Sequence, residues 1–427
     1  MSFIPHWREV PAEPGRVVAP DERLAWPQTV ALGFQHVIAM FGATVLAPLL
    51  MGFDPNVAIL TSGVGTLIFF ALVGGQVPSY LGSSFAFIGV VIAATGYAGQ
   101  SGPNPHIGLA LGGIMACGAL YTLFGVLVKF AGTRWIERLM PPVVTGTVVA
   151  VIGLNLASVP IKNMAPTDFD KWMQALTFLC VGWVAVRTSG MVQRLLILVG
   201  LLLASVLYAV LTNGLGLGKP IDLGALAAAP WLGMPNFAAP VFDGNAMLLI
   251  APVALILVAE NLGHIKAVSA MTGRNLDDKI GCAFVGDGVA TMVSGAIGGS
   301  GVTTYAENIG VMAATRIYSS AMFVVAAGVA IVLGFSPKFG ALIQTIPLAV
   351  MGGVSIVVFG LIAVAGAKIW VDNRVDFREN ANLLVAAIPL ILGTGDYTLQ
   401  FGSFALGGIG TATFGAVLLH ALLGRKP

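Results

Sequence analysis

The chain has 427 residues, of which 57% are hydrophobic and only 9% are charged, and its mean hydropathy is +0.91. Soluble proteins carry about 25% charged residues, so this composition excludes a surface that is water-compatible all round. The net charge of +2 is small and no basic run occurs, which argues against a nucleic-acid partner. With 55 glycines, the composition predicts an all-helical integral membrane protein whose helix backbones approach closely.

Apolar segments recur along the whole chain after a polar, proline-rich N-terminal tail at 1–27, which lacks a signal-peptide pattern. A spanning helix needs about 20 mostly apolar residues. We expect seven spans before a polar loop at 214–245 and seven after it. They lie at 28–50, 56–75, 83–97, 107–130, 139–160, 171–187, 191–213, 246–265, 281–298, 303–315, 317–335, 339–365, 379–394 and 402–423.

The distribution of lysine and arginine supports fourteen spans. With the N-terminus inside, the inner segments hold 17 of the 21 Lys and Arg residues and the outer loops hold 4. Cytoplasmic loops of membrane proteins show this bias. Both termini are therefore expected in the cytoplasm.

The third and tenth spans are too short to cross as complete helices, and each follows a polar, glycine-containing stretch, at 78–84 and 298–304. They also resemble each other, because Phe87-Ile-Gly-Val90 matches Asn308-Ile-Gly-Val311 without a gap. Seven is odd, so the second block would enter from the opposite side and form an inverted repeat. Interrupted spans at matching places indicate a substrate site near the membrane midplane. Chance similarity between Gly/Ala/Val-rich segments is the alternative.

Two carboxylates, Glu260 and Glu307, lie inside expected spans. A carboxylate at membrane depth costs roughly 2.5–3.5 kcal/mol on insertion scales, which makes it a functional candidate by default. Glu260 and His264 are four residues apart and share one helix face, so the pair could handle a proton. A metal site is the alternative, but the HExxH motif and a further ligand cluster are absent from the sequence.

Glu307 lies at the start of the short segment 303–315, where a half-helix N-terminus exposes backbone N–H groups. These groups could donate to substrate carbonyl oxygens while Glu307 accepts from substrate N–H groups. Phe85, Phe87 and Tyr305 lie beside the two breaks and could stack on a planar ring. A flat heterocycle with alternating N–H and C=O groups fits this set. Packing or lipid contact is the alternative for each aromatic residue.

Other polar residues inside spans favour structural roles. Asp287 is expected near the cytoplasmic end of its span, with capping or pairing favoured over substrate contact. Gln35 and His36 lie in the first span, where a hydrogen-bonded structural role is as consistent as a functional one. The three cysteines are far apart in apolar segments and are expected to be packing residues.

These stretches resemble a known family. Glu307-Asn-Ile-Gly-Val-Met-Ala-Ala-Thr-Arg316 looks like the signature of the nucleobase–ascorbate transporter family, also called nucleobase:cation symporter-2. Further stretches are similar to the bacterial uracil and pyrimidine permeases of that family: Gln35–Thr44, Tyr80–Phe87, Glu260–His264, Pro20–Leu24 and Val285–Gly288. The likeness covers nearly the whole chain.

The resemblance implies a fold of 7+7 inverted repeats in which spans 3 and 10 each carry a short strand and a half-helix. It also implies a core domain and a gate domain, with a homodimer formed through the gate. On this chain the parts are a cytoplasmic tail at 1–27, core parts at 28–131 and 246–336, and gate parts at 132–245 and 337–427.

The implied function is proton-coupled symport of a pyrimidine nucleobase, uracil or thymine, across the bacterial inner membrane, with neither an enzymatic activity nor a cofactor. The implied substrate-binding residues are Glu260, Glu307, Phe85, Ala306 and Tyr305; Glu260 and His264 would couple protons, and Gln35, His36, Asn308 and Ser84 would support them. Ala306 stands where some uracil permeases have glycine, so its methyl group could narrow the pocket or shift the preference between uracil and thymine.

Three other functions agree with the sequence less well. An anion transporter shares the architecture, but Lys and Arg are confined here to loops and span ends. No HExxH, GxSxG or paired-Asp motif supports an intramembrane enzyme. A xanthine or purine permease differs only in pocket dimensions and stays open.

Overall fold

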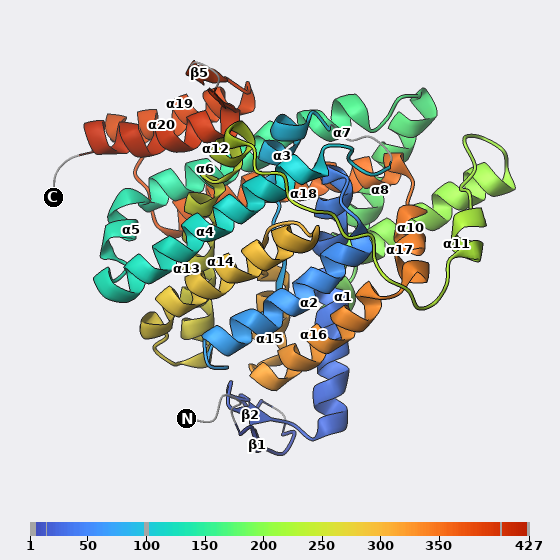
Figure 1. Ribbon diagram of the computed structural model, residues 1–427, viewed down its shortest axis with the longest axis horizontal. Coiled ribbons are helices and arrows are strands. Elements are labelled where there is room, and N and C mark those ends of the chain that lie inside the picture. Colours follow the sequence, from blue (N-terminus) through green and yellow to red (C-terminus); the bar gives the residue numbers. More distant parts are fainter. Residues whose placement is uncertain (1–5, 14, 98–101, 402–403, 425–427) are drawn as a thin grey trace.

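The computed structural model describes residues 6–13, 15–97, 102–401 and 404–424, and these are predominantly helical (Figure 1). Among these residues, eight helices are long and apolar enough to cross a membrane, or nine if the bent pair Ser320–Gly334 and Pro337–Gln344 counts as one span. The prediction of a helical multi-pass membrane protein is confirmed.

The elements of the first half are β1 (Arg8–Glu9), β2 (Glu22–Arg23), α1 (Trp26–Met51), α2 (Pro55–Leu72), β3 (Leu81–Ser83), α3 (Phe87–Thr95), α4 (Ile107–Ala131), α5 (Arg134–Leu139), α6 (Pro142–Leu156), α7 (Ser158–Asn163), α8 (Asp168–Arg187), α9 (Gly190–Arg194), α10 (Leu196–Ala209) and the π-helical turn η1 (Val210–Gly214).

Those of the second half are α11 (Gly224–Ala228), α12 (Gly244–Ile250), α13 (Val253–Thr272), the 3-10 turn η2 (Asp277–Lys279), α14 (Ile280–Ile297), β4 (Val302–Thr304), α15 (Ala306–Thr315), α16 (Ser320–Gly334), α17 (Pro337–Gln344), α18 (Leu348–Asp372), α19 (Asn380–Thr394), β5 (Leu399–Phe401), β6 (Phe404–Leu406) and α20 (Gly408–Leu423).

Local sequence explains several helix ends. Asp54 begins α2 because its side chain accepts hydrogen bonds from the backbone N–H groups of Asn56 and Val57. Thr167 and Asp170 form a capping box at the start of α8. Gly52 ends α1 in the left-handed conformation, at φ 74°, which glycine adopts without steric cost.

Two expected spans are wrong in their boundaries. The segment 339–365 is divided into α17 and α18, and α17 bends by 82° from α16. Pro347 immediately precedes α18 and has no N–H group to continue the preceding helix. The span expected at 246–265 breaks at Pro252 between α12 and α13, and α13 then continues to Thr272. The first two residues of the span expected at 402–423 lie outside the described residues.

The helices pack as two groups. In the first group, α14 packs on α4 and α2, α16 packs on α1 and α2, and α13 packs on α4. In the second, α18 packs on α6 and α8, α19 packs on α6 and α20, and α10 packs on α8. Figure 1 shows α2, α14 and α16 side by side, whereas α19 and α20 lie together away from them. Each group therefore contains helices from both halves of the sequence.

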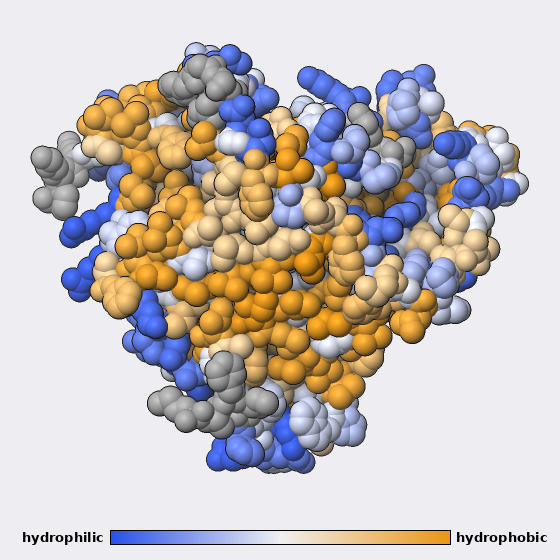
Figure 2. Space-filling model, viewed as in Figure 1, coloured by the Kyte–Doolittle hydropathy of each residue, from blue (hydrophilic) through white to orange (hydrophobic). Residues whose placement is uncertain are grey.

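The surface carries a broad apolar region that a bilayer would cover. Figure 2 shows hydrophobic residues across the middle of the molecule and hydrophilic residues gathered near its edges. Phe130, Trp172 and Val186 expose 83%, 76% and 79% of their surface. Apolar exposure on this scale marks an interaction surface, here with lipid.

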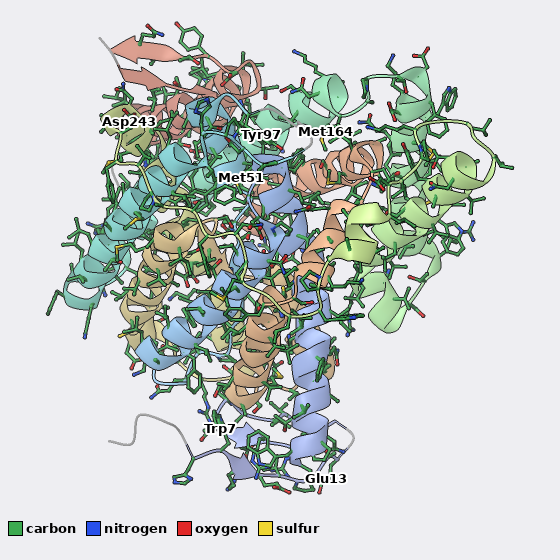
Figure 3. All side chains as sticks on the ribbon, turned by 45° about the vertical axis from the view of Figure 1, so that its right-hand side comes forward. Trp7, Glu13, Met51, Tyr97, Met164 and Asp243 are labelled. Atoms are coloured by element: carbon green, nitrogen blue, oxygen red, sulfur yellow. The ribbon has the colours of Figure 1, made fainter. Side chains whose placement is uncertain are left out.

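The N-terminal tail folds back on the protein rather than extending from it. Val18 accepts a hydrogen bond from the backbone of Tyr318 at 2.8 Å and donates one to Arg316 at 3.1 Å. The Trp7 indole donates to the Ser320 hydroxyl at 2.9 Å. Figure 3 shows Trp7 and Glu13 near the start of α1, and Met51 and Tyr97 near its other end. The tail thus covers the end of α15 and the start of α16.

We expect Gly288→Val to separate α4 from α14. A Cβ at Gly288 would lie 2.6 Å from the Thr122 backbone nitrogen and 2.7 Å from the Gly118 carbonyl oxygen. Overpacking costs about 1–3 kcal/mol, so the thermal unfolding midpoint of the purified protein should fall clearly. Gly182→Val is the matched control, because nothing lies within 4 Å of that position. Equal midpoints for the two variants would contradict this packing.

Candidate functional site

Two short strands meet in the protein interior. β3 and β4 pair antiparallel, with Leu81 opposite Thr304, Gly82 opposite Thr303 and Ser83 opposite Val302. Both strands are buried, and each is followed by a short helix, α3 or α15. The backbone can leave the helical conformation at this depth only where protein or water satisfies its polar groups. The strands supply that partner to each other.

Hydroxyl groups of neighbouring helices satisfy the outer edges of this small sheet. The backbone N–H of Leu81 donates to the Thr66 hydroxyl of α2 at 2.9 Å. The Val302 N–H donates to the Thr291 hydroxyl of α14 at 3.2 Å, and that hydroxyl donates to the Val302 carbonyl at 2.9 Å. Leu81 and Val302 occupy matching places in the two similar sequence segments, because each lies six positions before the matched residues Phe87 and Asn308. The two strands are thus held in equivalent ways.

Glu260 and Glu307 come together beside this sheet. Glu260 lies on α13 and Glu307 lies in the first turn of α15, and α13 packs against both α15 and β4. Both side chains are half-buried. Across the described residues, neither carboxylate has a Lys, Arg or His partner within ion-pair distance. Two acids without a basic partner can therefore accept hydrogen bonds from a polar ligand.

His264 is connected to the sheet rather than standing alone. Its Nδ1 atom lies 2.8 Å from the Thr304 hydroxyl of β4, and that hydroxyl donates to the Asn261 side-chain oxygen at 3.0 Å. Asn261 in turn donates to the Tyr121 hydroxyl of α4 at 2.8 Å and to the Asp287 carboxyl group at 2.5 Å. Asn261, Thr304 and Tyr121 were not predicted from the sequence. A polar side chain inside an apolar span indicates a buried hydrogen bond. The partners, however, lie on three separate helices and a strand and cannot be identified from the sequence.

The expected position of Asp287, near the end of its span, is wrong. Asp287 lies in the middle of the 18-residue helix α14 and is fully buried. Its partners are Asn261 and Tyr121, so the expectation of a pairing role agrees with the contacts. The expected span at 281–298 nearly coincides with α14, and Gly281 and Gly288 on either side of Asp287 pack closely against α4.

The aromatic candidates differ in their surroundings. Tyr305 is 4% exposed, and its hydroxyl accepts from Thr44 at 3.0 Å and donates to the Ser83 carbonyl at 2.9 Å. Its ring covers Gly82, where a Cβ would lie 2.5 Å from Cζ. Phe85 is half-buried and packs against the edge of the hydrophobic core. Tyr305 therefore braces the sheet, and Phe85 is the better placed of the two for stacking.

Ser84 and Ala306 mark the starts of the two short helices. The Ser84 backbone N–H donates to the Gly301 carbonyl at 3.0 Å, and its hydroxyl accepts from the Ala86 N–H at 3.2 Å. Ala306 is exposed at the first position of α15, directly before Glu307. Its methyl group consequently lies on the accessible side of the site.

Asn308 joins α15 to α1. Its amide donates to the His36 Nδ1 atom and to the His36 carbonyl oxygen, both at 3.0 Å. His36 is fully buried, and its ring lies 4.6 Å from the ring of Phe323. Gln35, its neighbour on α1, is half-buried. The pair His36 and Asn308 holds the helix that carries Glu307.

Other chemistry has little support within the described part of the chain. That part contains no group of three or more His, Cys, Asp or Glu residues suited to hold a metal ion. Cys117, Cys180 and Cys282 are free thiols. A hollow of about 490 Å³ lies elsewhere, between the N-terminal tail and the end of α15.

Broken helices that place acidic side chains together inside a bundle of spans define a multi-pass membrane transport protein. A family model described as "Permease family" (Xan_ur_permease) matches residues 27–401. The chain belongs to this family and is a permease rather than an enzyme.

Relatives of high identity extend over the whole chain. A protein of Escherichia coli strain K12 named as a pyrimidine permease, RutG, is 65% identical over 428 residues, covering 100% of this chain and 96% of the relative. The uracil permease of Bacillus caldolyticus is 41% identical, covering 94% of this chain and 93% of the relative.

A solved structure shares the fold. The transmembrane domain of the cyanobacterial bicarbonate transporter BicA aligns with a TM-score of 0.63 at 16% identity, covering 92% of this chain and 97% of that domain. At this identity the likeness concerns the fold alone.

Proposed function

We propose that the protein carries a pyrimidine nucleobase, uracil or thymine, into the cell together with protons. The placement of Glu260 on α13 and Glu307 on α15, two helices that pack together beside the paired strands β3 and β4, is the observation that supports this most strongly. The names of the relatives, pyrimidine permease and uracil permease, agree with it.

The chemistry of the site suits a flat imide ring. Glu307 accepts from ring N–H groups, and the first backbone N–H groups of α15, which have no partner within the helix, donate to ring carbonyl oxygens. Glu260 completes the binding from α13, and Phe85 stacks on the ring. Ala306 limits the space on the accessible side, where the methyl group of thymine would compete with it.

Glu260 and His264 carry the coupled proton in this proposal. They lie one turn apart on the same face of α13, and both are half-buried. A carboxyl and an imidazole at the substrate site can gain and lose a proton as the site changes the side to which it opens. No cofactor or metal is required.

The proposed architecture is fourteen spans arranged as 7+7 inverted repeats. The two helix groups support a core at 28–131 and 246–336 and a gate at 132–245 and 337–427. The matching attachment of Leu81 and Val302 supports the inversion. The protein would lie in the bacterial inner membrane with the tail 1–27 and the C-terminus in the cytoplasm. It would form a homodimer through the gate and bind no nucleic acid.

Transport would follow alternating access, and the two short helices differ in a way that supports it. A Cβ at Gly89 of α3 would lie 2.6 Å from Ile409 and 3.4 Å from Asn155, both in the second helix group. At Gly310, the matching position of α15, nothing lies within 4 Å. The position of Gly89 is thus closely packed and the matching position of Gly310 is open. In the opposite state, α15 would close against the gate.

We expect Gly310→Phe to block this closure while leaving the present conformation intact. Overpacking a closed interface costs about 1–3 kcal/mol, so uptake should fall by about tenfold or more. Gly182→Phe is the control, because that position is also open and lies among the exposed side chains of Leu179, Trp183 and Val186. Uptake at the wild-type rate in Gly310→Phe would contradict closure at α15.

Uptake of radiolabelled uracil into proteoliposomes, with and without an inward proton gradient, tests the proposed function. Competition by unlabelled thymine, xanthine and other bases defines specificity. Accumulation that follows the proton gradient and is prevented by pyrimidines is expected. Uptake that is independent of the gradient would contradict proton coupling. Competition by xanthine alone would favour a purine permease.

An anion transporter of the same fold is the second candidate, because BicA is a bicarbonate transporter. An anion would meet Glu260 and Glu307 at close range without a Lys or Arg partner among the described residues. Like charges repel strongly in a site of low polarity. This charge arrangement favours the nucleobase.

A further inference from the structure

The hydrogen-bond network behind His264 crosses four elements of the protein. It runs from Asp287 on α14 to Asn261 on α13, then to Thr304 on β4 and back to His264 on α13, with Tyr121 of α4 beside it. α4, α13 and α14 pack on one another. Asn261, Tyr121 and Asp287 are fully buried and Thr304 is 2% exposed. Water therefore has no access to these four, and each donor must use a partner within the protein.

The direction of these hydrogen bonds can be deduced from one end. Both protons of the Asn261 amide are used, because its nitrogen donates to Asp287 Oδ2 and to the Tyr121 hydroxyl. Its oxygen therefore faces Thr304 and accepts the single proton of that hydroxyl. Turning the amide round would place two acceptor oxygens against each other at Asp287.

His264 is the last member of the network, and the direction of the hydrogen bonds determines which of its ring nitrogens carries the proton. The Thr304 hydroxyl has no second proton, so it can only accept from the imidazole across the 2.8 Å contact. His264 must then carry its proton on Nδ1, and the lone pair of Nε2 is the only basic position on the ring.

We propose that Asn261 and Thr304 are positioning residues that hold neutral His264 in the Nδ1–H tautomer, which directs the coupled proton to Nε2. This rests on the proposed role of His264 in proton coupling. The proton adds to the Nε2 lone pair to form the imidazolium, while the Nδ1–H bond to Thr304 is kept. Its release restores the neutral ring.

Other titratable groups lie around this network and could affect the direction of its hydrogen bonds. These are Glu260 on the same helix, Glu307 on α15, Asp287 on α14, Tyr121 on α4 and Tyr305 before α15. Asp287 Oδ1 makes no hydrogen bond of good geometry within the described residues, and the Thr304 backbone N–H offers this carboxyl only a weaker interaction. Oδ2 can thus accept from Asn261 even when a proton occupies Oδ1. The direction of the chain therefore holds while Asp287 Oδ2 carries no proton, because only a proton on Oδ2 would let the Asn261 amide turn round.

The test is the tautomer itself, measured by 15N NMR on full-length protein in lipid bilayers with labelled histidine. The chain has five histidines, and the His264→Gln spectrum assigns the His264 signals. The wild type is expected to show Nδ1 protonated and Nε2 unprotonated. Thr304→Val removes the acceptor and Asn261→Leu frees the Thr304 proton for donation, so both variants should shift the population toward Nε2–H.

Two controls separate this effect from general damage. Thr304→Ser keeps the hydroxyl and should keep the tautomer. Thr303→Val makes the same chemical change at the neighbouring position of β4, where the hydroxyl is buried and unpartnered, and should also keep it. If Thr304→Val fails to fold, Asn261→Leu and the wild type still decide the question. An Nε2–H tautomer in the wild type, or one unchanged in both Thr304→Val and Asn261→Leu, would overturn the proposal.

Transport measurements distinguish this proposal from the proposed function. Loss of one hydrogen bond should lower proton-driven uptake in Thr304→Val by about threefold to tenfold, with Thr304→Ser near wild type. A KM close to wild type would place the effect on coupling rather than binding. If wild-type uptake ignores the proton gradient while His264 shows the Nδ1–H tautomer, proton coupling fails and the tautomer assignment stands.

Discussion

Glu307→Ala should abolish high-affinity nucleobase binding while the protein remains folded. The change removes the carboxylate at the first turn of α15, which has no basic partner among the described residues and is free to accept from a ligand. Hydrogen bonds to a charged group contribute about 1.5–3 kcal/mol, so uracil affinity should fall by about tenfold to hundredfold. Equilibrium binding of radiolabelled uracil to the purified protein measures the loss.

Two further variants make that result specific. Glu307→Gln keeps one acceptor oxygen and should lie between wild type and Glu307→Ala. Glu137→Gln changes an exposed carboxylate on α5 and should bind normally. Elution of Glu307→Ala as a single peak with the wild-type unfolding midpoint shows that it is folded. Near-normal uracil affinity in such protein would remove Glu307 from the site.

Glu260→Gln should separate binding from accumulation. Glutamine keeps the shape and the hydrogen-bonding capacity of the side chain but cannot gain or lose a proton at any relevant pH. If Glu260 carries the coupled proton, this variant equilibrates uracil across the membrane and does not concentrate it against a gradient. Binding and exchange of labelled for unlabelled uracil should survive, because the contacts to the ring remain.

The same proteoliposomes measure both quantities. Net uptake driven by an inward proton gradient is compared with exchange at equal pH on both sides, for wild type and Glu260→Gln. Wild type should accumulate uracil in the first assay. The variant should show exchange in the second assay but no accumulation in the first. Accumulation of uracil by Glu260→Gln in response to the gradient would assign the coupled proton to another group.

The sequence by itself determined the class of protein, the family and the principal acidic residues. Low charge and long apolar segments require a lipid environment whatever the tertiary arrangement, because helices are the way such segments satisfy their backbone there. Glu260 and Glu307 could be singled out because a carboxylate inside an apolar span is costly. The match of Phe87–Val90 with Asn308–Val311 placed the two breaks at 78–84 and 298–304, where the structure has β3 and β4.

The tertiary structure alone decided which residues act together. Pairing of β3 with β4 joins strands from opposite halves of the chain, and the packing of α13 on β4 brings His264 to Thr304. The burial of Asp287 and its pairing with Asn261 and Tyr121 depend on how α14 packs against α4 and α13. The role of Tyr305 as a brace likewise depends on neighbours distant in sequence. Composition and periodicity indicate whether a segment is in contact with lipid or with water. Hydrogen-bond partners, in contrast, are set by the packing of segments on one another.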